Sequence, residues 1–183
     1  MKEFDFSYLE QRYGIQVRFV EETDAEFIVE LRTDSKLSRF IHATDDSVEK
    51  QREWIREYKK RETAGKESYF LYAKDGVAFG VSKINDIQSD RPSVGSWVCQ
   101  KGLPFELPVL SLIIVYEFVF EQLKFDCLYF NIMKQNKKVI KTNLMVGAEQ
   151  ISEDDLEYYY VLRKEIFFEK KDYVLKLLNP SVN

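Results

Sequence analysis

Residues 94–148 constrain the fold of this chain more than any other segment. A strand-like run at 94–100 is followed by a loop, an apolar stretch at 107–123, a second strand-like run at 127–133 and a helical stretch at 136–146. The apolar stretch contains two glutamates and is shorter than the ~20 apolar residues that a membrane-spanning helix requires. We therefore interpret residues 107–123 as a buried helix that connects two strands.

The remaining segments predict further strands and helices. Strand-like patterns, with apolar and polar side chains in alternation or apolar runs between turn residues, occupy 15–20, 68–73, 77–87 and 156–162. Helical spacing of apolar side chains occupies 23–34, 46–65 and 164–178. In the run 77–87, the apolar positions change parity between Val81 and Ile84, which predicts a bulge or a strong bend. The sequence thus predicts an α/β (α+β) fold: a mixed, mostly antiparallel twisted sheet flanked by helices.

The length and composition predict one domain. The chain has 183 residues, of which 45% are hydrophobic, and this is enough to bury one sizeable core. It contains no internal repeat, no low-complexity tract and no linker rich in proline, glycine and serine. We therefore expect a single domain over 1–183, in which 1–14 is a leader and 164–178 is a carboxyl-terminal helix.

The charge and the cysteines exclude several classes of function. Net charge is −4, with no block of lysine and arginine, which disfavours nucleic-acid and membrane partners. Cys99 and Cys127 fall in strand-like runs, where a free cysteine behaves as a small buried hydrophobe, and the first residues lack an apolar run of signal-peptide type. We therefore expect a cytoplasmic protein. No cluster has metal-ligand spacing, and no hydrolase, kinase or dehydrogenase motif occurs.

The order of elements and three local motifs resemble the GCN5-related N-acetyltransferase (GNAT) family. Phe130-x-Ile132-x-x-x-Asn136, followed by Gly147-Ala148, is similar to the family's fifth strand and the helix after it. Val17-Arg18 and Leu31-Arg32-Thr33-Asp34 are similar to the amino-terminal signature of the branches that acetylate ribosomal proteins, antibiotics or nucleotide-linked amino sugars. The resemblance covers residues 16–163 and implies an acyltransferase that uses acetyl-coenzyme A.

The resemblance also implies where acetyl-coenzyme A binds. The fourth and fifth strands of the family part, so that unpaired backbone groups of the fourth strand hold the pantetheine arm and the next helix binds the pyrophosphate at its amino end. In this chain the loop differs from the family pattern, because Pro104, Glu106 and Pro108 stand among its small residues. The cofactor-binding residues implied are Trp97, Val98, Cys99, Lys101, Gly102, Asn136 and Asn143.

For the catalytic residues, the resemblance leaves alternatives for both the proton donor and the base. Asn143 stands where many relatives carry a tyrosine that protonates the departing thiolate, so that water, Tyr158 or Tyr160 takes that role here. Asp86, Glu149 and His42 are the candidates for the base that deprotonates the acceptor ammonium, and His42 is the single histidine of the chain.

Three hypotheses for function follow. The first is acetyl transfer from acetyl-coenzyme A to the primary amine of a small molecule, such as a nucleotide-linked amino sugar. A net acidic chain has no evident patch for docking on a ribosome, which favours a small acceptor over a ribosomal protein. The second is a binding or assembly module without catalysis, such as a homodimer formed through exposed aromatic side chains. The third is acetylation of a protein's amino terminus, which requires an open groove.

Overall fold

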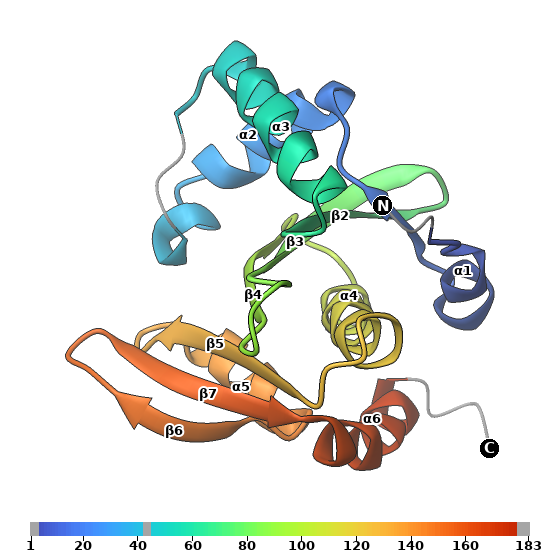
Figure 1. Ribbon diagram of the computed structural model, residues 1–183, viewed down its shortest axis with the longest axis vertical. Helices are drawn as coiled ribbons and strands as arrows, with labels where there is room; N and C mark the ends of the chain where they lie inside the picture. Colours follow the sequence, from blue (N-terminus) through green and yellow to red (C-terminus); the bar gives the residue numbers. More distant parts are fainter. Residues whose placement is uncertain (1–3, 42–44, 179–183) are drawn as a thin grey trace.

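The structure confirms the predicted fold class, a mixed and mostly antiparallel sheet flanked by helices. The computed structural model describes residues 4–41 and 45–178 (Figure 1). Their strands form one seven-stranded sheet in the order β1-β2-β3-β4-β5-β7-β6, and every neighbouring pair is antiparallel except β4 and β5. The strands are β1 Gln16–Phe19, β2 Ser68–Lys74, β3 Val77–Asn85, β4 Ser93–Cys99, β5 Cys127–Met133, β6 Glu149–Glu153 and β7 Glu157–Arg163.

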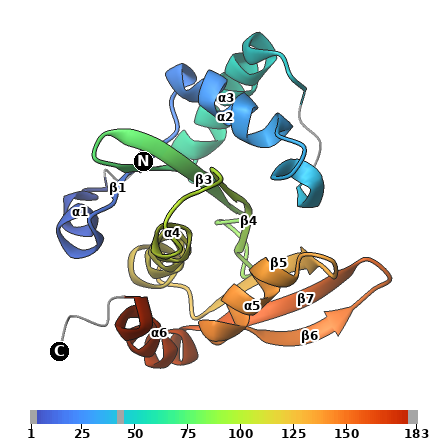
Figure 2. The ribbon, with the colours of Figure 1, turned by 180° about the vertical axis from the view of Figure 1, so that it is seen from behind.

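The helices lie on both faces of this sheet. Figures 1 and 2 show α2 and α3 side by side next to β2 and β3, with α4 on the opposite side. The helices are α1 Ser7–Tyr13, α2 Ala25–Thr33, α3 Val48–Thr63, α4 Glu106–Glu117, α5 Lys137–Met145 and α6 Lys164–Leu178, with 3-10 turns η1 Glu22–Asp24 and η2 Ser38–Phe40 and a π-helical segment η3 Phe118–Gln122. The two faces of the sheet therefore bury two separate apolar clusters.

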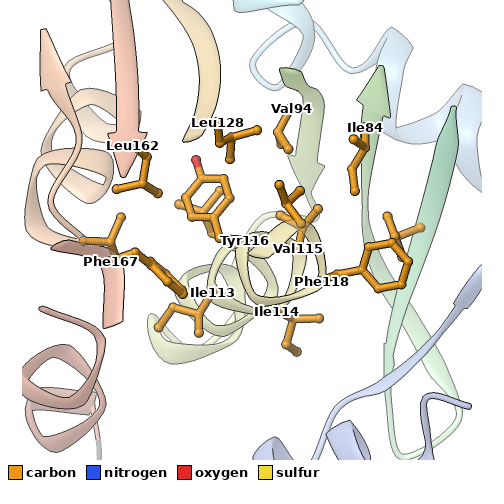
Figure 3. Packing of buried hydrophobic residues seen from close by; sticks show 14 of the residues in the cluster. Ile84, Val94, Ile113, Ile114, Val115, Tyr116, Phe118, Leu128, Leu162 and Phe167 are labelled. Atoms are coloured by element: carbon orange, nitrogen blue, oxygen red, sulfur yellow. The ribbon is translucent and has the colours of Figure 1, made fainter. Parts of the chain in front are cut away.

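Helix α4 is the centre of the larger cluster. Its side chains are apolar nearly all round and contact β3 and β4 on one side and β5, β7 and α6 on the other (Figure 3). Ile113, Val115 and Val119 are fully buried, and burial of each such side chain stabilises the fold by about 1.5–3 kcal/mol. The prediction of a buried helix at 107–123 is thus confirmed. In the described part of the chain, no helix combines the length and apolar character that crossing a bilayer demands.

One ion pair is buried where α4 meets α6. The Nζ atom of Lys171 lies 2.5 Å from Oε1 of Glu117, and neither residue is appreciably exposed. Arg12 of α1 approaches the same oxygen at 3.4 Å, while Oε2 of Glu117 has no hydrogen-bond partner in the part of the chain that the structure describes. A charged bridge therefore joins α1, α4 and α6 inside otherwise apolar surroundings.

The segment that the sequence set apart as a leader packs on the core. Residues 7–13 form helix α1, and its Leu9 is 1% exposed. Before the helix, the rings of Phe4 and Phe6 lie 4.8 and 5.8 Å from the ring of Phe118. These aromatic side chains bury a large apolar area, which explains why the segment contacts the body.

Strand β6 was absent from the sequence-based prediction. All of its residues are exposed, because it is an edge strand that pairs only with β7. Its glutamates and glutamine give no period-2 apolar pattern, which is the signal that identifies a half-buried strand. The irregularity that was predicted between Val81 and Ile84 is confirmed by a register shift between β3 and β4, where Val81 pairs with Val98 and Lys83 pairs with Gly95. A second irregularity, which was not predicted, lies where Tyr72 pairs with Gly80 and Ala73 pairs with Ala78.

Gly147 follows α5 at a position that has no room for a side chain. Its φ is +95°, and a Cβ atom there would lie 2.6 Å from Cγ2 of Ile166. We expect Gly147→Ala to lower the free energy of unfolding by about 2–4 kcal/mol, from backbone strain and overpacking together. Urea unfolding measures this change. The control is Gly65→Ala, where φ is +68° but no atom lies within 4 Å, so only about 1 kcal/mol of strain is expected.

Candidate active site

The fourth and fifth strands part along most of their length. They pair at one position, Ser93 with Tyr129, where the N–H of Tyr129 also donates to the carbonyl of Pro92 at 3.0 Å. Beyond this point β4 stays paired with β3, whereas β5 pairs with β7 from Cys127 to Met133. Beyond Ser93, the edge of β4 that faces β5 has no strand partner among the described residues, and the predicted parting of these strands is confirmed.

A bulge in β4 bends the strand at this edge. Val81 of β3 pairs with Val98 and Lys83 pairs with Gly95, so β4 has one residue more than β3 between these two matches. Ser96, inside the bulge, has a φ of +50°. A bulge raises the local twist and bends its strand. The bulge at Ser96 therefore contributes to the divergence of β4 from β5.

Two cavities lie along the parted strands. The larger, which we call the basic cavity, has a volume of about 400 Å³ and is lined by β4, the loop before α4, α4, α5 and the segment after α2. The smaller, the amide-lined cavity, has a volume of about 300 Å³ and is lined by β4, β5, α4 and α5. They share five lining residues: Phe40, Ile41, Trp97, Asn136 and Val139.

Cationic side chains gather at the basic cavity. It is lined by Lys36, Arg39, Lys101 and Lys138, together with Gly102, whose φ is +74°. Lys101 donates a hydrogen bond to Asp34, which lowers the pKa of that carboxyl below its usual value. The cavity can therefore hold an anion with several phosphate groups.

Glu106 does not oppose this charge. The sequence places Glu106 in the loop expected to receive a pyrophosphate, but the structure puts it at the first residue of α4, in the wall of a different cavity with Arg12 and Lys74. At that position the carboxylate interacts favourably with the positive end of the helix dipole.

Trp97 is fixed between the two cavities. Its Nε1–H donates to Oγ of Ser111 at 3.0 Å, and the hydroxyl of Ser111 donates to the carbonyl of Pro108 at 2.8 Å. The indole therefore lies against α4 and forms part of the wall of both cavities. Both Val98 and Cys99 line the basic cavity, and burial raises the pKa of the Cys99 thiol to about 12. Cys99 is thus a neutral thiol near pH 7 and not a nucleophile.

The amide-lined cavity contains a carboxylate that the sequence analysis missed. Glu157, the first residue of β7, lines the cavity, and its Oε2 accepts a hydrogen bond from Nδ2 of Asn131 at 2.6 Å. Among the described residues that line this cavity, Glu157 is the one acid. Three tyrosines follow Glu157 in the sequence and were chosen by residue type instead. The pairing of β5 with β7 places Glu157 at the cavity, since it lies opposite Met133, inside the Phe130–Asn136 motif.

A buried tyrosine faces the same cavity from α4. The hydroxyl of Tyr116 donates to Oδ1 of Asn143 at 2.5 Å, and Nδ2 of Asn143 donates to the carbonyl of Val139 at 2.9 Å. The ring of Tyr116 stacks on Phe130, with centroids 6.0 Å apart. It also meets the ring of Phe167 edge-on, and Figure 3 shows these two residues near each other. The sequence analysis took Tyr116 only as part of a buried apolar helix, because nothing local shows that α4 and α5 bring their side chains together.

The structure separates most of the other predicted catalytic residues from the cavities. Asp86 lies in the turn after β3, where it is exposed and accepts a hydrogen bond from Ser93 at 3.3 Å, and it lines neither cavity. Tyr160 is buried against Phe130, with centroids 5.6 Å apart, and Tyr158 packs beside Lys134.

Neither of those tyrosines lines the basic cavity or the amide-lined cavity. Glu149 forms an ion pair with Arg163 at the edge of the sheet. His42 lies outside the described residues. The predicted cofactor-binding residues, in contrast, all line one cavity or the other.

Comparison with known proteins supports the family. Residues 15–149 match the family model described as an acetyltransferase (GNAT) domain. A solved structure described as apo FdhC, a nucleotide-linked sugar GNAT, is 36% identical over 90% of this chain and 95% of its own, with a TM-score of 0.80.

Two other solved structures share the fold at lower identity. The Campylobacter jejuni N-acetyltransferase PseH is 20% identical over 82% of this chain and 98% of its own, with a TM-score of 0.65. The ribosomal-protein-S5-alanine acetyltransferase of Vibrio fischeri is 12% identical over 90% and 96%, with a TM-score of 0.73. A comparison with curated proteins gave no match. The chain therefore belongs to the GNAT family and is an acyltransferase.

Proposed function

We propose that this protein transfers an acetyl group from acetyl-coenzyme A to the primary amine of a nucleotide-linked amino sugar. The observation that supports this most directly is the parted edge of β4, with a cationic cavity and a carboxylate-bearing cavity beside it. In the reaction the amine nitrogen forms a bond to the thioester carbon, the carbon–sulfur bond breaks, and the nitrogen loses a proton. The parted strands hold the two reactants next to each other, which itself accelerates the reaction.

The basic cavity is the proposed site of acetyl-coenzyme A. The pantetheine arm pairs with the free edge of β4 near Trp97, Val98 and Cys99, as an added strand would. Lys101, Lys138 and the other cations of that cavity bind the phosphates. Asn136 and Asn143 line the continuation of the same slot along α5.

The amide-lined cavity is the proposed site of the acceptor amine. A carboxylate there binds an ammonium group and can take its proton, and Glu157 has this position, held by Asn131. We propose Glu157 as the base in preference to Asp86, because only Glu157 lines the cavity. Asp86 instead accepts a hydrogen bond from the hydroxyl of Ser93 and so helps to position that residue.

The lining of the amide-lined cavity favours an amino sugar over a polyamine. Asn85, Ser93 and Ser96 join the asparagines on β5 and α5, and amides and hydroxyls are suited to the hydroxyl groups of a sugar. A polyamine carries several positive charges and would need several carboxylates, whereas Glu157 is the one carboxylate among the described lining residues. The relative at 36% identity is described as a nucleotide-linked sugar GNAT, which agrees with this choice.

Calorimetry with acetyl-coenzyme A tests the proposed cofactor site. We expect the protein to bind it, and Lys138→Ala to raise Kd about fivefold, as for an exposed charge pair worth about 1 kcal/mol. The effect should shrink at high salt, because counterions screen exposed charges. The control is Lys141→Ala, on the same helix and also exposed but outside both cavities.

The same experiment can contradict the proposal. Absence of any heat of binding with acetyl-coenzyme A rules out the acetyl transfer proposed here. If binding occurs, acetylation assays on UDP-linked and dTDP-linked sugars with one free amine, on spermidine and on peptides with a free amino terminus identify the acceptor. Faster turnover of spermidine or of a peptide than of every sugar overturns the choice of substrate class.

A further inference from the structure

Acyl transfer from a thioester releases a thiolate, and a hydrogen-bond donor next to the sulfur lowers the barrier to that release. The donor must reach the slot between β4 and β5, must hold its proton near pH 7, and must be fixed in place. Neither Tyr158 nor Tyr160 lines the basic cavity or the amide-lined cavity. A side chain that donates to the sulfur in place of water therefore comes from another element.

Among the described residues that line the amide-lined cavity, one is a tyrosine, Tyr116 of α4, and its hydroxyl bonds to Asn143 in the same wall. A phenol is a far stronger proton donor than the aliphatic hydroxyls of Ser93 and Ser96 in the same wall. Ser93 also donates its proton to Asp86 already. Tyr116 is therefore the hydroxyl in this cavity with the chemistry of a proton donor.

The position of Tyr116 relative to α5 places its hydroxyl near the boundary of the two cavities. Its partner Asn143 lies on one face of α5 with Asn136 and Val139, because these positions differ by three, four and seven residues. Asn136 and Val139 line both cavities. The hydroxyl thus lies beside the wall where the basic cavity meets the amide-lined cavity, which is where a thioester reaching from one to the other would have its sulfur.

We propose that Tyr116 donates a hydrogen bond to the sulfur of the departing coenzyme A thiolate, with Asn143 as a positioning residue; the inference rests on the function proposed above. As the carbon–sulfur bond breaks, its electron pair goes to sulfur, and the phenol keeps its own proton while its hydrogen bond stabilises the thiolate. The acceptor ammonium loses two protons on its way to the amide. Glu157 passes both to water, one of them ends on the sulfur, and the other is released.

The surroundings of Tyr116 suit this role. Burial raises the pKa of its phenol above the ordinary value, so the hydroxyl keeps its proton near neutral pH. Stacking on Phe130 fixes the ring, and the amide of Asn143 is itself held by the carbonyl of Val139. The hydroxyl hydrogen can rotate from Asn143 toward a sulfur atom without movement of the ring.

Binding of coenzyme A and of desulfo-coenzyme A, which lacks the sulfur atom, tests the contact directly. At pH 9 a thiol is largely ionised, and a hydrogen bond to a charged group contributes enough that the wild-type protein should prefer coenzyme A by about tenfold or more. In Tyr116→Phe this preference should fall to about twofold or less, because the donor is gone while the packing ring remains. Asn143→Ala should reduce it partially.

Tyr72→Phe is the matched control. Tyr72 is also fully buried, and its hydroxyl pairs with Ser82 at 2.6 Å, but it lines neither cavity. This variant should keep the full preference for the sulfur-containing ligand. If Tyr116→Phe keeps it as well, the inference is wrong while the proposed function stands. If the wild-type protein binds neither ligand, the proposed function itself fails.

Discussion

Glu157→Gln is expected to lower kcat/KM for amine acetylation by about 10²–10⁴-fold, the usual contribution of a positioned general base. Glutamine keeps the shape of the side chain and can still hydrogen-bond with Asn131, but it cannot take a proton from the acceptor ammonium. The loss should diminish as pH rises through the pKa of the acceptor, because the amine is then already unprotonated. Release of coenzyme A, followed with a thiol-reactive dye across pH, measures both effects.

Two variants separate this role from a general effect of charge. Glu153→Gln removes a carboxylate from β6 that pairs with Lys134 at 3.4 Å and lines neither cavity, so it should leave the rate nearly unchanged. Asp86→Asn removes the base that the sequence suggested. A severe loss in Asp86→Asn, together with normal activity in Glu157→Gln, would restore Asp86 as the base and reject Glu157.

Lys171→Met is expected to lower the free energy of unfolding by about 3–5 kcal/mol, because it leaves the buried carboxylate of Glu117 without its closest partner. Arg12 still approaches Glu117 at 3.4 Å, but it is half exposed and cannot replace the buried ammonium. Oε2 of Glu117 has no hydrogen-bond partner within bonding distance among the described residues, so the loss falls on a carboxylate that is already poorly satisfied. Urea denaturation followed by circular dichroism measures the change.

Replacing both partners of the ion pair provides a control for this prediction. Glu117→Leu combined with Lys171→Met removes both charges and should recover most of the lost stability, since an apolar pair fits the surroundings of α4 and α6. Lys60→Met, which breaks an exposed pair with Glu57 on α3, should change stability by less than about 1 kcal/mol. If Lys171→Met is no worse than Lys60→Met, the pair does not carry the energetic role assigned to it.

Most of the fold was readable from local sequence pattern. The strands at the centre of the sheet are apolar on one face or both, and residues 107–123 are apolar nearly all round. These apolar runs and the turn residues between them predicted β2 to β5 and α4. The parting of β4 from β5 followed from the family resemblance and is present in the structure. Strand β6 was not predicted because an exposed edge strand needs no apolar side chains. Helix α1 was not predicted because the burial of its segment depends on aromatic contacts with the distant Phe118.

The site was less predictable, since its side chains meet only through the tertiary structure. Tyr116 and Asn143 are separated by 27 positions in the chain, and Asn131 and Glu157 by 26. Nothing in the composition of α4 distinguishes Tyr116 from the apolar residues around it. Predicted residues that followed a backbone feature, such as Trp97 to Cys99 at the parted edge, lie at the cavities, whereas Tyr158 and Tyr160, chosen by residue type, do not.

A ligand bound between the parted strands would also stabilise the fold. Beyond Ser93, the backbone groups of β4 that face β5 have no strand partner among the described residues, so the sheet is held together across this gap mainly by α4 and α5. A ligand that completes the hydrogen-bond ladder there binds the native state and not the unfolded chain, and it must raise the melting temperature in proportion to the logarithm of its concentration. The lifetime of the protein in a cell would then follow the supply of its acyl donor.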